Sequence, residues 1–279
     1  VWRPVDAAAD PVPVILEYLP YRKRDGTCAR DALTHPWFAK RGYACVRVDM
    51  RGNGDSDGLM ADEYTPQELA DAVEVIAWLA AQDWCSGTVG MMGISWGGFN
   101  ALQVAALQPA PLKAIITLCS TVDRYADDIH YKGGCLLNEN LGWGATMWSY
   151  SSRAPDPALR DDWRAVWLDR LENEPFLPEV WLRHQRRDAY WRHGSVCEDF
   201  AALKVKVLAP MRRHLWKNNN VQSLRRSGTC AQPLPQACCL PPCLNNRLRF
   251  NCSACFHSLM PRTTSRLSST TYLRRRGPN

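Results

Sequence analysis

The sequence predicts an α/β protein with a mostly parallel β-sheet flanked by helices. Two observations lead to this class. Short apolar runs alternate with stretches of helical period over the first 209 of the 279 residues, which is typical of parallel strands joined by helices. One apolar run, residues 89–94, stops at a Gly-x-Ser-x-Gly turn and is followed at once by a helical pattern. Hydrophobic residues make up 46% of the chain, enough for a sizeable core.

The N-terminal part predicts two strands and the helix between them. The first strand covers residues 12–18, and a polar loop follows over residues 19–26. A helix with Trp37 and Phe38 facing inward then leads to a second strand over residues 43–48. This order is the first repeat of a parallel sheet.

The loop over residues 49–58 alternates Asp or Asn with Gly and so mimics a calcium-binding loop. An EF-hand loop would need a later glutamate and two flanking helices, whereas this segment follows a strand and lacks that register. We therefore expect no metal here. We expect Asp49 and Arg51 to hold the loop by local hydrogen bonds and an ion pair.

A capping box marks the start of the next helix. Thr65-Pro66-Gln67-Glu68 places a capping hydroxyl, a proline at the first helical position and a glutamate three residues after the cap. The helix ends near Gln82. Its apolar residues recur at helical spacing: Leu69, Ala72, Val73, Ile76 and Ala80.

The Gly93-Ile94-Ser95-Trp96-Gly97 turn predicts a nucleophile. A serine at a tight strand-to-helix turn sits in strained backbone, and small residues two before and two after it let strand and helix pass closely. The turn exposes the Ser95 hydroxyl and offers the Trp96 backbone N–H to a developing oxyanion. The alternative is a Gly/Ser turn that only precedes a buried helix.

After this turn the chain predicts a helix to about Leu107 and a buried strand over residues 112–118. Aromatic residues in helical patterns then indicate a helical cap lying over the site, in which His184 and His193 are expected to be structural or solvated. A strand pattern returns over residues 204–208. The predicted organisation is a core over residues 1–122, the cap over 123–200, a returning core strand within 201–209 and a tail over 210–279.

The tail differs in composition from the rest. Residues 1–209 hold 22 Lys and Arg against 28 Asp and Glu, whereas residues 210–279 hold 12 basic residues and no acidic one. The tail has no hydrophobic period, so we interpret it as disordered or as out-of-frame translation. Alternatives are a zinc site formed by two cysteine pairs (Cys239 and Cys243, Cys252 and Cys255) or nucleic-acid binding by its arginines.

Bulk features suggest a compartment. No run of about 18 apolar residues exists, so no membrane-spanning segment is expected. The six cysteines before residue 210 are scattered, as reduced cysteines are in cytosolic proteins, and we predict a cytoplasmic location. The chain starts at Val1 without a methionine or a signal-like stretch, so we expect its true N-terminus to be missing.

Residues 1–209 resemble the CocE/NonD-type serine hydrolases, the group of cocaine esterase, α-amino-acid ester hydrolases and X-prolyl dipeptidyl peptidases. Four motifs carry the resemblance: Leu19-Pro20-Tyr21, Asp49-x-Arg51-Gly52-x-Gly54-x-Ser56-x-Gly58, Asp83-Trp84-Cys85-Ser86-Gly87-x-Val89-Gly90 and Gly93-Ile94-Ser95-Trp96-Gly97-Gly98. The resemblance implies an α/β-hydrolase fold with a helical cap insertion and a C-terminal β jelly roll. The jelly roll is absent from this sequence, so the C-terminal half is expected to be incomplete.

The resemblance also implies roles. The loop tyrosine of the family corresponds to Tyr21, whose phenol would be the second oxyanion donor beside the Trp96 N–H; a tyrosine packed at a loop base is the alternative. The triad order in this fold is Ser, Asp, His, with the acid shortly after a strand such as 204–208. No acidic residue follows Asp199, so that pattern fails here.

The triad acid and base therefore stay unknown. Some hydrolases of this fold carry the triad acid at a position similar to that after the strand at 112–118. Asp123, Asp127 and Asp128 lie there in this sequence. The conceivable bases are His130, His214 and His257. Nothing in their spacing selects among them.

We predict a serine hydrolase that cleaves an ester or amide acyl bond through an acyl-enzyme on Ser95. X-Pro peptides are among the candidate substrates. No metal or organic cofactor is implied, because acid–base work and oxyanion stabilisation suffice. The expected partner is a small ester or a short peptide, with no nucleic acid and no membrane, and the oligomeric state stays open. Because a triad acid and base are missing, we expect the chain to be inactive as written.

Two other classes compete with this prediction. One is a non-enzymatic truncated pseudo-hydrolase whose cap binds an acyl ligand or whose basic tail binds nucleic acid. The other is a dehalogenase of the same fold, which would need an aspartate where Ser95 stands.

Overall fold

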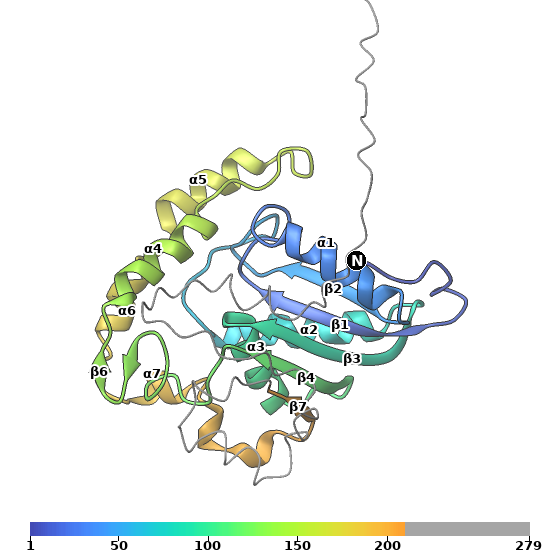
Figure 1. Cartoon of the computed structure of the whole chain (residues 1–279). Coiled ribbons are helices and arrows are strands. Elements are labelled where there is room, and N and C mark those ends of the chain that lie inside the picture. Colours follow the sequence, from blue (N-terminus) through green and yellow to red (C-terminus); the bar gives the residue numbers. More distant parts are fainter. Residues whose placement is uncertain (210–279) are drawn as a thin grey trace, which may run out of the picture. The chain divides into compact units, whose positions relative to one another are not determined.

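A computed structural model describes residues 1–209, which belong to one compact unit of the chain. Its central sheet has the strand order β2-β1-β3-β4-β7, and every pairing is parallel (Figure 1). The strands are β1 (Val12–Leu19), β2 (Ala44–Asp49), β3 (Cys85–Ile94), β4 (Leu112–Leu118) and β7 (Lys206–Leu208). The predicted α/β class with a mostly parallel sheet is confirmed.

The strands form where the apolar runs predict them. Helices cover a parallel sheet on both faces, so its strands are apolar over almost their whole length. The strand β4 has the predicted bounds, and β1 extends one residue beyond them. The returning strand is short, and its Val207 pairs with Ile115 of β4. The predicted tail, with His214, His257 and the two cysteine pairs, lies outside the described residues.

Three helices belong to the core: α1 (Cys28–Ala39), α2 (Pro66–Ala80) and α3 (Trp96–Ala106). The predicted start of α2 is correct, because the Thr65 hydroxyl accepts the Glu68 backbone N–H at 3.1 Å and Pro66 is the first helical residue. The carboxylate half of the predicted capping box is wrong. Glu68 turns into the core and accepts the backbone N–H of Tyr64 instead.

The inward face predicted for α1 is wrong for Trp37, whereas Phe38 is half-buried. Trp37 is 50% exposed and lies under the Arg41 guanidinium, while Asp31 and His35 are the buried residues of this helix. The cause is a charged patch on the sheet beneath it, where Glu17 of β1 and Arg47 of β2 are buried. A helix over such a patch presents charged partners, since buried charges require pairing.

Residues 123–200 are helical with one small hairpin that the sequence did not predict. The hairpin pairs β5 (Tyr131–Lys132) with β6 (Cys135–Leu136). In Figure 1 the helices α4, α5 and α6 lie on the side toward which the core strands point. The elements are α4 (Glu139–Ser151), α5 (Trp163–Asn173), α6 (Leu177–Leu182), α7 (Ala189–Arg192) and the 3₁₀ turns Val196–Glu198 and Phe200–Ala202.

Packing in this region depends on a few large side chains. Trp181 and Trp191 are fully buried, whereas α5 buries only Arg170. No helix within residues 1–209 is both long enough and apolar enough to cross a bilayer.

Candidate active site

Ser95 lies between β3 and α3 in a strained turn. Its φ is +53° and its ψ is −120°, a backbone conformation that costs a non-glycine residue on the order of 1–3 kcal/mol. A Cβ on Gly93 would lie 2.3 Å from the backbone carbon of Gly97, and a Cβ on Gly97 would lie 2.9 Å from Leu19 Cδ2. Gly93 therefore requires glycine, because it faces backbone, whereas a side chain at Gly97 would first have to displace that of Leu19. The predicted strand–turn–helix is present, and the role of Ser95 as nucleophile stays a prediction.

The two predicted oxyanion donors lie together. The Trp96 N–H donates to Tyr21 Oη at 3.3 Å. They meet because β1 and β3 are neighbouring parallel strands, so the loop after β1, which carries Tyr21, leaves the sheet beside the turn after β3. A carbonyl oxygen next to Ser95 that entered between these groups would accept a hydrogen bond from each.

Helix α4 places two aromatic rings against Tyr21. The ring centroids of Trp143 and Tyr150 lie 6.4 and 5.9 Å from that of Tyr21, and both side chains are half-buried. Trp143 also lies 6.4 Å from Trp96. Sequence reasoning missed these two residues, although their separation of two helical turns places them on one face of a helix.

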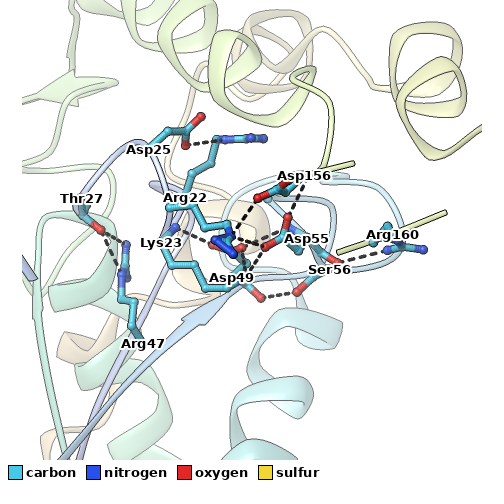
Figure 2. Close-up of polar contacts among 12 residues, drawn as sticks. Arg22, Lys23, Asp25, Thr27, Arg47, Asp49, Asp55, Ser56, Asp156 and Arg160 are labelled. Carbon is cyan, nitrogen blue, oxygen red and sulfur yellow. Dashed lines mark hydrogen bonds and ion pairs between the residues drawn. The ribbon is translucent and has the colours of Figure 1, made fainter. Parts of the chain in front are cut away.

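The loop that carries Tyr21 is anchored by buried charge. Asp49 Oδ1 accepts the Lys23 backbone N–H at 2.7 Å, and Lys23 Nζ bridges Asp49 (2.5 Å) and Asp55 (2.7 Å), as Figure 2 shows. The prediction that Asp49 holds its own loop is confirmed, since its carboxylate also accepts the Asp55 backbone N–H. The predicted local ion pair of Arg51 within this loop is wrong, because Arg51 pairs with Asp71 of α2 instead.

The same loops are tied to α5 and to the segment before it. The buried guanidinium of Arg170 donates to the carbonyls of Gly54 and Ser56, at 3.0 and 2.6 Å. Arg22 donates to the carbonyls of Arg153 and Ala154, while the Asp156 N–H donates to the Asp55 carboxylate drawn in Figure 2. These bonds join the loops after β1 and β2 to residues 153–170.

Two of the three acid candidates after β4, Asp123 and Asp127, have other partners. Asp123 accepts the backbone N–H groups of Tyr125 and Ala126 and pairs with Arg187. Asp127 pairs with Lys132 at 3.0 Å. Burial raises the pKa of Asp128 to about 6, although the nearby His130 opposes the rise.

The histidines are likewise engaged elsewhere. His130 is fully buried, with Nδ1 2.8 Å from Asn140 Oδ1 and Nε2 2.8 Å from Glu63 Oε2. His184 contacts Asp188, and His193 Nε2 lies 2.6 Å from the Tyr64 carbonyl oxygen. Within residues 1–209, no histidine is hydrogen-bonded to Ser95, and the triad is not assembled there.

One buried cluster has the ligand types of a metal site. Donor atoms of Glu17, Asp31 and His35 lie within 4.8 Å of one another. Arg30 pairs with both carboxylates, however, and Arg47 Nε lies 3.2 Å from Asp31. Two guanidinium groups already neutralise two carboxylates, so a divalent cation here would add two uncompensated charges. The residues do not fit a metal ion.

Comparison with known proteins decides the family. Residues 1–220 match the X-Pro dipeptidyl-peptidase (S15) family. The chain belongs to this family. Among similar proteins, cocaine esterase from Rhodococcus sp. (strain MB1 Bresler) is 32% identical over 227 residues, covering 72% of this chain and 39% of the esterase. The resemblance drawn from the four motifs is thereby confirmed.

Solved structures agree on the fold. A CocE/NonD family hydrolase from Staphylococcus aureus has a TM-score of 0.54 at 23% identity, covering 71% of this chain and 35% of that one. An α-amino acid ester hydrolase has a TM-score of 0.53 at 21% identity, covering 71% of this chain and 37% of that one. This S15 chain thus spans 35 to 39% of the length of these three relatives.

Proposed function

We propose that this chain carries the nucleophile and the oxyanion hole of a serine hydrolase and forms an acyl-enzyme on Ser95. The observation that carries the proposal is the meeting of the Trp96 N–H and Tyr21 Oη, 3.3 Å apart, beside the strained turn of Ser95. Membership in a family that contains esterases and dipeptidyl peptidases supports it.

The proposed reaction follows from these groups. Ser95 Oγ attacks the carbonyl carbon of the substrate and passes its proton to a solvent water, while the C=O electron pair moves onto the oxygen. The resulting oxyanion accepts hydrogen bonds from the Trp96 N–H and the Tyr21 hydroxyl. Collapse of this intermediate expels the alcohol or amine, which takes up a proton from solvent, and leaves an ester on Ser95. Water then releases the acid.

The proposed substrate is a small ester or a short peptide, X-Pro peptides among them. Trp143 and Tyr150, whose rings lie against Tyr21, would form an apolar wall for one side of the reacting group. Such a wall favours a substrate with an apolar or aromatic substituent next to the scissile carbonyl.

We further propose that this chain both acylates and turns over slowly. No acidic residue follows Asp199, and no histidine of residues 1–209 is bonded to Ser95. Loss of a triad base costs on the order of a million-fold in rate in a serine protease, whereas oxyanion donors alone retain a residual acceleration.

A fluorophosphonate probe tests the proposal. The expected result is slow accumulation of one adduct per chain, found by intact mass after prolonged incubation and mapped to Ser95, with Ser95→Ala as the unreactive control. Turnover of p-nitrophenyl esters by the same sample is expected to be slow. Absence of an adduct in a sample shown to be folded by circular dichroism would refute the proposal and favour a protein that only binds its ligand.

A further inference from the structure

Trp96 is held at both of its polar groups. Its backbone N–H faces Tyr21 Oη, and its indole Nε1–H donates to Glu68 Oε1 at 2.7 Å. The side chain is fully buried. One residue therefore connects the candidate oxyanion hole on one side with a buried carboxyl group of α2 on the other.

Glu68 also holds the residue that packs against Trp96. Its Oε2 accepts the backbone N–H of Tyr64 at 2.8 Å. The Tyr64 ring lies 5.2 Å from that of Trp96 and 5.3 Å from that of Phe99. Tyr64 has a φ of +56°, a strained value for a non-glycine residue that its surroundings must maintain.

These bonds are not needed to cap α2. The Thr65 hydroxyl already accepts the Glu68 backbone N–H, and Pro66 has no N–H to satisfy. Transferring a carboxyl group from water into the core is costly, so its bonds to the Trp96 indole and the Tyr64 backbone N–H must offset that cost. The group is 6% exposed, and both of its oxygens accept bonds from residues that lie at or against the turn.

We propose that Glu68 is a positioning residue for the oxyanion hole, in which its carboxyl group fixes the Trp96 indole and so keeps the Trp96 backbone N–H directed toward Tyr21 Oη. The inference rests on the function proposed above. Rotation of the Ser95–Trp96 peptide would relieve the strain at Ser95 and would turn the N–H away. The anchored indole opposes that rotation because it cannot move without breaking its bond to Glu68.

The first test measures the rate at which Ser95 reacts with the fluorophosphonate probe in the full chain. We expect Glu68→Leu to react about 10-fold more slowly, a part of the loss seen when an oxyanion donor is removed. Glu68→Gln keeps one acceptor oxygen and should recover part of the rate. Thr65→Ala is the matched control, because it loses a helix cap worth about 1 kcal/mol while the Glu68 carboxyl group keeps its bonds to Trp96 and Tyr64; its rate should stay within about 2-fold.

A double variant tests the route of the effect. Trp96→Phe removes the indole donor and keeps the backbone N–H, so Glu68→Leu should cost little further rate in that background. Full additivity of the two losses would contradict a shared route. An unchanged rate in Glu68→Leu, at a stability equal to that of Thr65→Ala, would assign the carboxyl group a structural role only and overturn the proposal.

A second readout does not depend on reactivity. In ¹H–¹⁵N spectra of the full chain, Glu68→Leu should shift both the indole and the backbone amide resonances of Trp96, whereas Thr65→Ala should shift neither. If the wild-type chain does not react with the probe, the proposed function fails on its own. The positioning of Trp96 is then decided by the spectra, and an unmoved Trp96 backbone amide would overturn it.

Discussion

Glu63 and Glu68 are five residues apart and both are buried, with exposed fractions of 3% and 6%. Their partners differ. Glu63 contacts the His130 imidazole at 2.8 Å, the Trp143 indole at 2.6 Å and the Arg124 guanidinium at 3.9 Å. The Glu68 carboxyl group contacts neutral donors: the Trp96 indole, a backbone N–H and the side chain of Asn100.

The two carboxyl groups differ accordingly in their protonation. Burial raises the pKa of Glu68 to about 7, and its hydrogen-bond donors offset only part of that rise. Burial acts in the same direction on Glu63, but His130 and Arg124 outweigh it and lower the pKa of Glu63 below its ordinary value. Partner charge, not depth, therefore decides which of two equally buried carboxyl groups is ionised.

The largest expected effect is the loss of the charged partner of Glu63. His130→Ala leaves a buried carboxylate without its closest cation and also opens a cavity. We expect the free energy of unfolding to fall by about 3–5 kcal/mol at neutral pH. Urea denaturation followed by fluorescence measures it. A loss below about 1 kcal/mol would mean that the pair is not a buried ion pair.

The next effect concerns pH and Glu68. Its folded pKa of about 7 lies above the ordinary value of 4.5, so between these values the unfolded chain loses this proton and the folded chain keeps it. The stability that Glu68 contributes is therefore present below pH 4.5 and lost as the pH rises through 7. Relative to Glu68→Gln, wild-type stability should fall by about 3 kcal/mol over this window in urea titrations at stepped pH.

Glu63 should show the opposite sign. Because its folded pKa is lowered, its contribution is present above its ordinary pKa of 4.5 and lost as the pH falls through the folded value. Burial lowers the pKa of His130, but Glu63 outweighs burial and raises it above the ordinary value of 6.5. The stability that His130 contributes is therefore present below pH 6.5 and lost as the pH rises through its folded pKa. If the free energy of unfolding depended on pH in the same way in Glu63→Gln and in Glu68→Gln, the opposite signs expected for the two carboxyl groups would be contradicted.

A smaller effect is expected from one indole donor. Trp143→Phe removes the hydrogen bond to the ionised Glu63 and should cost about 1.5–3 kcal/mol at neutral pH. Trp96→Phe removes the equivalent bond to Glu68 and should cost less at pH 6, where Glu68 is protonated. Thermal denaturation of both variants at that pH measures the difference, and a larger loss for Trp96→Phe would reverse the assignment.

The smallest effect is expected at a partly exposed pair. His184 lies 2.7 Å from Asp188, as close as His130 lies to Glu63, but both partners are partly in solvent. His184→Ala should change the free energy of unfolding by less than about 1 kcal/mol, because water screens the interaction. If His184→Ala lowered the free energy of unfolding as much as His130→Ala, the distance between the partners rather than their burial would determine how much each pair stabilises the fold.

The turn at Ser95 could be predicted because its geometry is local. Gly93 and Gly97 lie two residues either side of Ser95; the missing side chain of Gly93 lets β3 pass close to α3, and that of Gly97 lets α3 pass close to Leu19 of β1. The helix start at Thr65 is local for the same reason. Glu68 fits the capping-box pattern in the sequence, but its side chain binds Trp96, 28 residues away. No spacing rule indicates that partner.

The failures have a common cause. The prediction that Trp37 faces inward treats α1 as an ordinary amphipathic helix, and it is wrong because Glu17 and Arg47 lie beneath the helix. The sequence also left His130 open as a catalytic base. Only the fold brings it to Glu63, 67 residues before it, where both ring nitrogens are engaged.

The amino-acid sequence alone determined the parallel sheet, the strained turn and the place of Tyr21 in the loop after the first strand, because periodicity and glycine spacing act over a few residues. The tertiary structure decided which buried charges meet, what holds Trp96 and Tyr21 in place, and which aromatic rings of α4 contact the site. Those contacts join residues tens of positions apart, and their energies depend on the dielectric and on partners that exist only after the chain has packed.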